Sequence, residues 1–500
     1  MRLCLGISRR TSLAADPSSV ALSWARENLV PDDEQRASIQ ETIAELQGPL
    51  DSHVDDSEVD HLRHHIDLWS SLLAPIRRIP REVLSEIFLQ PSLHESPRAR
   101  SPKFSHRGTN AILAVSHHWR ETILSTAEFW AQFDVALPGN SNGASLLELY
   151  LKRSKQAPLS IAVLAWGAGP IWHARILQLL ISSCERWAHL YLETGSAGLP
   201  ALSPLRGHLP LLSSLDLHLH SGWMPLDTPQ SSATAQPDAF EVAPCLTTLT
   251  LNVRNFPITP LLPLLPQPQI KNLVIGNLDS LLFAKDFPDL RILSFSRTSM
   301  KFGMDGLSSA VEISAPVLHA FPLMLKFITA PAVRLLDLDT KLGIDNHTTL
   351  SMDIWTPFIR RSACRPHTLQ LHNLVIPSRD LLPMLTDLPN LHTLVLRDLG
   401  RPDAITTNLL TQLTLSPSGA GTMIFPELTN LTIVGSYIFT NVSLLAMLES
   451  RSDSIERVKL EFKQRTFTAE ELHRARALKG KGVDLTLWCV DAEKKYVQMI

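Results

Sequence analysis

Cysteine is scarce and scattered in this chain of 500 residues, which has only Cys4, Cys184, Cys245, Cys364 and Cys489. Secreted disulfide frameworks and structural zinc sites need closely spaced cysteines, and no two of these five lie close together in the sequence. The composition therefore predicts reduced thiols, an intracellular protein and no structural metal site.

An excess of charge is also missing, because 46 Lys and Arg residues face 49 Asp and Glu residues, for a net charge of −3. Such a balance gives no electrostatic attraction to nucleic acid or to anionic lipid. The longest apolar stretch, 157–172, is interrupted by polar residues, glycines and a proline, so it is too short to cross a bilayer. The sequence thus predicts neither a nucleic-acid partner nor a membrane segment.

No grouping of residues typical of an active site is found in the sequence. It has no phosphate-binding glycine loop, no nucleophile elbow and no cysteine pair with metal-ligand spacing. His61, His64 and His65 cluster near Asp60, but on a charged helix face we expect them to be solvated rather than to bind a metal. We therefore expect no catalytic residue, no metal and no cofactor.

The length and the hydrophobic content point to a folded chain with more than one part. Five hundred residues exceed what a single core holds, and 44% of them are hydrophobic. Residues 1–31 are predicted to be a disordered tail. Three arginines precede the first acid, Asp16, so an import peptide is the alternative for this segment.

Residues 32–73 are predicted to form amphipathic helices. Apolar residues recur at spacings of four, three and four in two runs: Ile39, Ile43, Leu46, Leu50, and then Leu62, Ile66, Trp69, Leu73. This periodicity places each run along one helix face, which needs a partner surface. We expect that surface to be the chain's own next domain, with a short self-associating coiled coil as the alternative.

A helical segment follows. Residues 79–88, IPREVLSEIF, predict a helix in which Pro80 suits the first turn and Glu82 is favoured there by the helix dipole. A loop rich in Pro, Ser and Arg spans 91–107, and a second helix begins near Asn110. On periodicity alone this segment is a small helical bundle without a stated purpose.

Three motifs in this segment resemble those of the F-box. Residues 79–88 resemble its first helix, and Val115-Ser-His-His-Trp119-Arg120 resembles its second motif, where a cysteine usually stands in place of Ser116. The run 124–130, LSTAEFW, and the lead-in at 73–78 are similar to the large F-box/leucine-rich-repeat families of mushroom-forming fungi (basidiomycetes). The resemblance places an F-box-like domain at 74–135, with an unrelated helical bundle as the alternative.

The resemblance also implies partners. An F-box docks a Skp-type adaptor protein and, through it, a cullin. The adaptor-binding residues that it implies are the apolar members of these motifs: Ile79, Pro80, Val83, Leu84, Ile87, Phe88, Val115, Trp119, Leu124 and Trp130.

A repeated unit dominates the chain beyond residue 140. It reads proline, any residue, apolar, two of any kind, apolar, one of any kind, apolar, and it starts at Pro210, Pro244, Pro268, Pro288, Pro316, Pro331, Pro389 and Pro426. Copies without proline end at Leu192 and Leu460, and a degenerate copy passes through Leu369 and Leu371. The segment 381–388 between two units is leucine-rich and is predicted to be helical.

The spacing of the units indicates their fold. Successive middle positions lie from 15 to 37 residues apart, around the roughly 20–29 residues of leucine-rich repeats. The shortest step, from Phe321 to Leu336, is too short for a unit, so one of the two is not expected in a strand. Because no unit buries its apolar edge alone, we expect a stacked leucine-rich-repeat solenoid over 140–490. An all-β or α/β globular domain is the alternative.

Each unit is predicted to contribute one strand, and the middle apolar residues are predicted to form one parallel buried ladder. Strand residues alternate sides, so their neighbours, such as Asp216, His218, Thr250 and Asn252, face outward on a concave surface. The later strands carry longer outward side chains, which are the candidate substrate-binding residues: Gln370, His372, Arg397, Arg457, Lys459 and Glu461. An ordinary solvated face, with binding elsewhere, is the alternative.

The sequence therefore predicts an α+β multi-domain protein with N-terminal helices, an F-box-like bundle and an irregular α/β solenoid. The expected function is a non-enzymatic substrate adaptor of an SCF-type cullin–RING ubiquitin ligase in the cytoplasm or nucleus. A repeat scaffold or regulatory binding protein acting outside a ligase is the alternative, and an enzyme with a dispersed active site is a third class.

Overall fold

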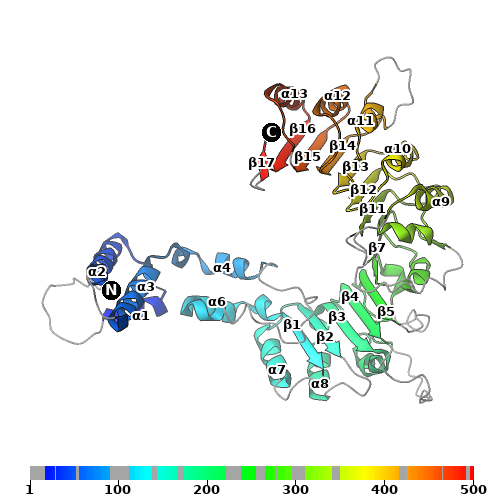
Figure 1. Cartoon of the computed structure of the whole chain (residues 1–500). Helices are drawn as coiled ribbons and strands as arrows, with labels where there is room; N and C mark the ends of the chain where they lie inside the picture. The colour runs from blue at the N-terminus through cyan, green and yellow to red at the C-terminus, as the bar shows by residue number, and fades with distance from the viewer. Residues whose placement is uncertain are drawn as a thin grey trace, which may run out of the picture. The chain divides into compact units, whose positions relative to one another are not determined.

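The computed structural model describes residues 17–28, 30–51, 56–90, 112–137, 143–165, 174–220, 238–254, 265–276, 279–295, 310–340, 349–415, 425–463, 465–490 and 496–500. The chain is α+β, with a large and mostly parallel sheet (Figure 1). It divides into two compact units. Unit 1 comprises Met1–Leu164 and His173–Arg186, and unit 2 comprises Ala165–Trp172 and Trp187–Ile500. None of the helices within the described ranges is long and apolar enough to span a membrane.

Unit 1 begins with three helices, α1 (Pro17–Arg26), α2 (Asp33–Asp51) and α3 (Asp56–Leu73). Ala21, Ile39, Trp69 and Leu72 form their buried core, and Ile43 and Leu46 of α2 pack against it. The apolar faces predicted from the periodicity thus pack against one another and against α1, whereas we expected the next domain to be their partner surface.

Helix α1 corrects the expectation of a disordered tail up to residue 31. Trp24 packs edge-on against Trp69 of α3, with 6.2 Å between the ring centroids. The apolar residues of α1 cover under three turns, which is too short a run for periodicity to reveal. Residues 1–16 of the predicted tail lie outside the described residues.

The predicted helix at 79–88 is confirmed as α4 (Arg81–Phe88), which follows the 3₁₀ turn η1 (Pro75–Arg78). Its partner α6 (His117–Ser125) begins after Ser116, whose hydroxyl accepts a hydrogen bond from the Trp119 backbone N–H at 3.1 Å. The two helices contact each other (Figure 1). The predicted loop 91–107 and the predicted helix start near Asn110 lie outside the described residues.

The rest of unit 1 alternates strands and helices. The 3₁₀ turn η2 (Ala127–Trp130) leads into β1 (Gln132–Leu137), α7 (Gly143–Arg153), β2 (Leu159–Ala165), α8 (Ala174–Ser182) and η3 (Cys184–Arg186). At the end of η3, the Arg186 guanidinium donates to the Ser154 hydroxyl at 2.7 Å and to the Ala157 carbonyl at 2.9 Å, which joins η3 to the segment between α7 and β2. The elements α7, β2, α8 and η3, which the sequence grouped with the repeats, belong to unit 1 apart from Ala165, which falls in unit 2.

The strands of unit 2 follow one another in chain order, each parallel to the next until the last pair, which is antiparallel. They are β3 (Trp187–Gly195), β4 (Ser214–His220), β5 (Thr248–Arg254), β6 (Asn272–Ile275), β7 (Ile292–Phe295), β9 (Val317–Ala320), β11 (Leu335–Asp339), β12 (Thr368–His372), β13 (Thr393–Arg397), β14 (Asn430–Gly435), β15 (Arg457–Lys463), β16 (Asp484–Val490) and β17 (Tyr496–Gln498). A separate parallel pair joins β8 (Val311–Glu312) to β10 (Ile328–Thr329).

The predicted buried ladder is confirmed. The register aligns Leu190, Leu215, Leu249, Leu273, Leu293, Leu318, Leu336, Leu369, Leu394, Leu431, Val458 and Leu485 in one row, and all are buried. A second buried row lies two residues further along each strand. One face of each strand from β3 to β16 in the main sheet therefore supplies the core of unit 2.

The unit at Pro316 departs from the predicted register. Leu318 occupies the ladder instead of Phe321, which lies buried just after β9 and before the 3₁₀ helix η9 (Pro322–Lys326). Of Phe321 and Leu336, which are only 15 residues apart, Leu336 is therefore the one that lies in a strand. Strand β16 was missed, because Gly482 stands where the repeat expects an apolar residue.

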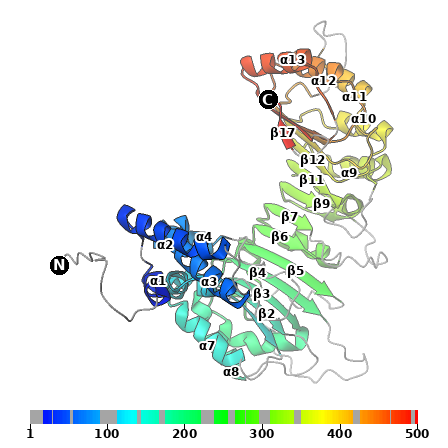
Figure 2. The same ribbon diagram turned by 60° about the vertical axis from the view of Figure 1, so that its left-hand side comes forward.

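The connections between strands change in kind along unit 2. Earlier ones are 3₁₀ segments: η4 (Ser196–Leu205), η6 (Gln267–Gln269) and η7 (Asp279–Asp286). Later ones are helices: α9 (Met352–Ser362), α10 (Ser378–Thr386), α11 (Thr407–Leu413), α12 (Asn441–Ser450) and α13 (Ala469–Gly480). Figure 2 shows α9–α13 along one side of their strands. The prediction of a helix within 381–388 is confirmed by α10.

Candidate interaction surfaces

Helices α4 and α6, together with the short segment 112–115 that precedes α6, expose large apolar side chains. Val83, Ile87, Val115 and Leu124 are 50%, 40%, 58% and 37% exposed, and Pro80 is exposed as well. Ile76 of the preceding 3₁₀ turn adds a further exposed apolar side chain. Grouped exposed apolar residues mark interaction sites in soluble proteins. We call Val83, Ile87, Val115 and Leu124 the outward apolar set.

The other candidate adaptor-binding residues lie inward. Leu84, Phe88 and Trp130 are buried, while Ile79 and Trp119 are half-buried. The rings of Phe88 and Trp119 meet edge-on with centroids 5.0 Å apart, and the Trp130 indole donates to the Ile123 carbonyl at 2.8 Å. These residues pack between the helices. Of the candidate adaptor-binding residues, it is therefore mainly the outward apolar set that is exposed to contact another protein.

Polar bonds fix the two helices against each other. Arg81 of α4 and Glu121 of α6 form an ion pair at 2.6 Å, and the hydroxyls of Ser85 and Thr126 lie 3.2 Å apart. His118 is half-buried beside them, and burial, together with the charge of Arg81, lowers its pKa. These contacts join α4, which carries Val83 and Ile87, to α6 and to Thr126 directly after it.

Arg77 links the chain that enters α4 to the helices α1 and α3. Its Nε donates to the Ser71 carbonyl at the end of α3 at 2.7 Å, and its Nη1 donates to the Ala25 carbonyl of α1 at 3.3 Å. Asn28 returns a bond to the Arg77 carbonyl at 3.4 Å. The helices α1 and α3 thus brace the chain where it enters α4.

The six candidate substrate-binding residues all lie on the outward face of the strands of unit 2. Gln370 and Lys459 belong to one row of the register, and His372, Arg397 and Glu461 belong to the next. Arg397, Arg457 and Lys459 are exposed, while the other three are half-buried. Since three strand steps separate β12 from β15, the two ends of the group lie about 14 Å apart.

A polar network on β3–β5 was not anticipated. His218 Nε2 lies 2.8 Å from Asp216 Oδ1, and the Asn252 amide nitrogen lies 3.1 Å from His218 Nδ1. Because an amide nitrogen only donates, Nδ1 accepts and the proton sits on Nε2, which donates to Asp216. Asp216, His218 and Asn252 therefore form one hydrogen-bonded network across β4 and β5.

Neighbouring residues complete this network. The Tyr191 ring packs 4.7 Å from the His218 ring, and its hydroxyl donates to Glu193 at 3.0 Å. A side chain at Gly276 would place Cβ only 2.7 Å from Cγ of Asn252, so glycine makes room for the network on the next strand. Asp216, His218 and Asn252 were identified as face residues, but their contacts join residues 34 positions apart, which a linear pattern does not show.

A second His–Asp group lies further along the same face. His319 Nδ1 is 2.8 Å from Asp337 Oδ2, and His372 Nε2 is 3.5 Å from Asp337 Oδ1. Gln370 Oε1 lies 3.3 Å from the same His372 nitrogen. Two of the candidate substrate-binding residues are thus held in place by neighbours on β11 and β12.

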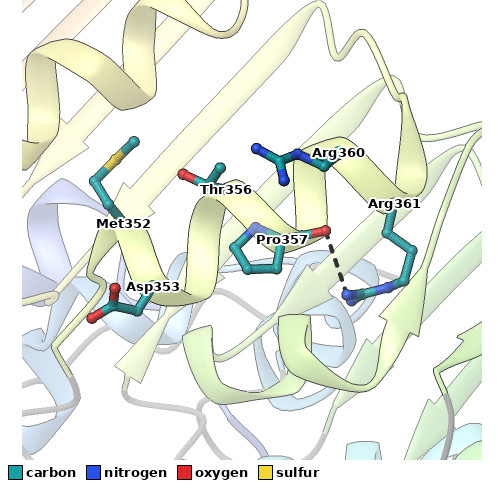
Figure 3. Close-up of a pocket in the computed structure, with 6 residues that line it drawn as sticks. All are labelled: Met352, Asp353, Thr356, Pro357, Arg360 and Arg361. Atoms are coloured by element: carbon teal, nitrogen blue, oxygen red, sulfur yellow. Dashed lines mark hydrogen bonds between the residues drawn. The ribbon is translucent and has the colours of Figure 1, made fainter.

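A shallow hollow lies along α9, on the helical side of unit 2. It is lined by Met352, Asp353, Thr356, Pro357, Arg360 and Arg361, all from one helix (Figure 3). The Arg361 guanidinium donates hydrogen bonds to the backbone carbonyls of Leu325 and Ile328, each at 2.7 Å. Because Arg361 is engaged by backbone carbonyls and all six lining residues come from one helix, we do not assign this hollow a ligand.

Among the residues that the structure describes, no group of three or more His, Cys, Asp or Glu side chains is arranged to hold a metal ion. No family model matches the chain, and no curated protein matches it significantly.

Proposed function

We propose that this protein is a substrate-recognition adaptor of an SCF-type cullin–RING ubiquitin ligase. In this proposal the segment holding α4 and α6 is an F-box that docks a Skp-type adaptor protein and, through it, a cullin. The observation that carries the proposal is the outward apolar set, since Val83, Ile87, Val115 and Leu124 are exposed and belong to the motifs that resemble those of the F-box.

Unit 2 has the second role in the proposal, as a leucine-rich-repeat solenoid that binds the substrate. Its support is the unbroken register of buried residues from β3 to β16 with the helices α9–α13 along one side. The outward strand face carries many polar side chains, and such an extended face suits a partner held by many modest contacts. Within it we assign substrate contact to Gln370, His372, Arg397, Arg457, Lys459 and Glu461.

In this role the chain performs no chemistry itself. It holds a substrate near the ubiquitin-loaded enzyme of the ligase, and the gain comes from replacing a bimolecular encounter by an effectively intramolecular one. The proposed complex is intracellular, in the cytoplasm or the nucleus.

Co-purification with a Skp-type adaptor tests the proposal. The double variant Val83→Asp with Ile87→Asp should lose adaptor binding, because it places unpaired carboxylates in an apolar interface. Both sites are solvent-exposed in the chain alone, so its circular dichroism should not change.

Leu149→Asp is the matched control, since Leu149 is an exposed leucine of α7 in the same unit, 38% exposed and outside the motifs. It should bind the adaptor like the parent chain. Adaptor binding by the double variant at parental affinity would rule out the assigned docking surface. Failure of the parent chain to bind any Skp-type adaptor would favour a scaffold acting outside a ligase.

A further inference from the structure

Two histidines of α3 face each other across one helical turn. The Nε2 atoms of His61 and His65 lie 3.2 Å apart, and their ring centroids lie 4.3 Å apart. His61 is exposed and His65 is half-buried, so the pair is reached from solvent. Residues four apart share a helix face, which is why the two rings can meet.

This separation matches that of two nitrogens bound to one metal ion. Imidazole nitrogens lie about 2.0–2.1 Å from zinc and similar ions. A metal at that distance from both Nε2 atoms, which are 3.2 Å apart, would subtend an N–metal–N angle of roughly 100°. That angle lies between the square-planar and tetrahedral values, so neither ring has to move far to bind.

We propose that His61 and His65 chelate one divalent late transition-metal ion through their Nε2 atoms. Water, or a side chain of another protein, fills the remaining coordination positions. Without metal, one ring can donate an Nε2–H to the other, which holds the nitrogens at the same separation. When the metal binds, the Nε2 proton of the donating ring is exchanged through water to Nδ1 of the same ring, so each neutral imidazole keeps one proton and offers its Nε2 lone pair to the metal.

The rest of α3 keeps the pair in place. Trp69 lies one turn beyond His65 and is buried in the core shared with α1 and α2, together with Leu72. The helix backbone that sets the distance between the two rings is therefore fixed by packing on the same element. A chelate spanning one turn exists only while α3 is helical, so binding favours the folded unit.

His64 provides a matched control on the same helix. Its ring lies 6.5 Å from that of His65, in a perpendicular arrangement, so it does not share the chelating geometry. His61→Gln and His64→Gln remove the same chemical group from neighbouring positions, and only the first breaks the proposed site.

Calorimetric titration of the full-length chain and these variants with Cu²⁺, Ni²⁺ and Zn²⁺ tests the proposal. We expect the parent chain and His64→Gln to bind one more equivalent of metal than His61→Gln does, or to bind at least tenfold more tightly. Cu²⁺ should bind most tightly of the three. Binding should weaken at pH 5, because the ligating imidazoles must be deprotonated.

Thermal unfolding supplies a second measurement that does not depend on counting other histidines. Ni²⁺ should raise the unfolding temperature of unit 1 in the parent chain and in His64→Gln, and leave that of His61→Gln unchanged. Equal metal binding by the parent chain and His61→Gln, or an equal loss in His64→Gln, would overturn the assignment.

Discussion

Arg451, which follows α12, is a cation inside the fold of unit 2. Only 1% of its surface is exposed, and its guanidinium donates to the carbonyls of Leu413 and Phe425, both at 2.7 Å. Burial lowers the pKa of Arg451 to about 10, which leaves it charged at neutral pH. The side chain thus ties α12 to the end of α11 and to the segment that enters β14.

Arg451→Met should lower the free energy of unfolding by about 2–4 kcal/mol, because two buried carbonyls lose their donors. Urea denaturation followed by circular dichroism measures the change. Arg457→Met is the control, since the Arg457 side chain is 72% exposed and its ion pair with Asp484 should contribute under about 1 kcal/mol. Equal effects of the two substitutions would show that the buried bonds carry no stability.

Asp134 of β1 makes stability depend on pH. Burial raises its pKa from 3.8 to about 6, so the folded chain favours the protonated carboxyl. Because the folded chain holds this proton more tightly, the protonated carboxyl stabilises the fold fully at pH values below 3.8, the pKa in the unfolded chain. That stabilisation is lost as the pH rises through about 6. The ionisation of Asp134 should therefore lower the free energy of unfolding of unit 1 between pH 4 and pH 7.

Asp134→Asn should remove that loss. The variant is expected to unfold at a higher temperature than the parent chain at pH 7.5, by the equivalent of about 1 kcal/mol, with little difference at pH 4. Asp484→Asn, at a 67% exposed side chain, should show no such crossover. A variant that is less stable than the parent at pH 7.5 would mean that ionised Asp134 has a favourable partner.

At the scale of single residues, the sequence predicted which strand residues face outward, but not which motif residues of α4 do. Val83 and Leu84 are adjacent in one motif, yet one is 50% exposed and the other is buried. Motif resemblance assigned both to a partner. Only the packing of α4 on α6 separates them, and that depends on residues more than 30 positions away.

At the scale of elements, strong periodicity was a reliable guide and weak periodicity was not. The ladder from Leu215 to Val458 followed from the spacing of apolar residues alone. The segment PVLHAFPLML at 316–325 is almost continuously apolar and is compatible with several registers. Packing against β7 and β11 selects Leu318, which local pattern does not reveal.

The register at β9 can be tested directly. Leu318→Asp should destabilise unit 2 by several kcal/mol, because it places a carboxylate inside the buried ladder. Leu323→Asp, in the half-buried position of η9, should cost clearly less. The midpoint of urea denaturation compares the two, and a larger cost at Leu323 would contradict the observed register.

At the scale of the whole molecule, the account assigns two functions to two separate surfaces. The outward apolar set belongs to unit 1, and the polar strand face belongs to unit 2. The sequence led to this assignment through the resemblance of 79–130 to F-box motifs and through the leucine-rich repeated unit. It could not predict the polar networks around His218 and Asp337, because their partners come from neighbouring strands.

Hydrogen exchange of the full-length chain, alone and saturated with a Skp-type adaptor, tests whether the adaptor docks on the outward apolar set. We expect slower exchange at 79–90 and 112–125, where this set lies, and unchanged exchange in the strands β3–β16. Absence of protection in both helical segments, or protection confined to unit 2, would show that the adaptor does not dock there.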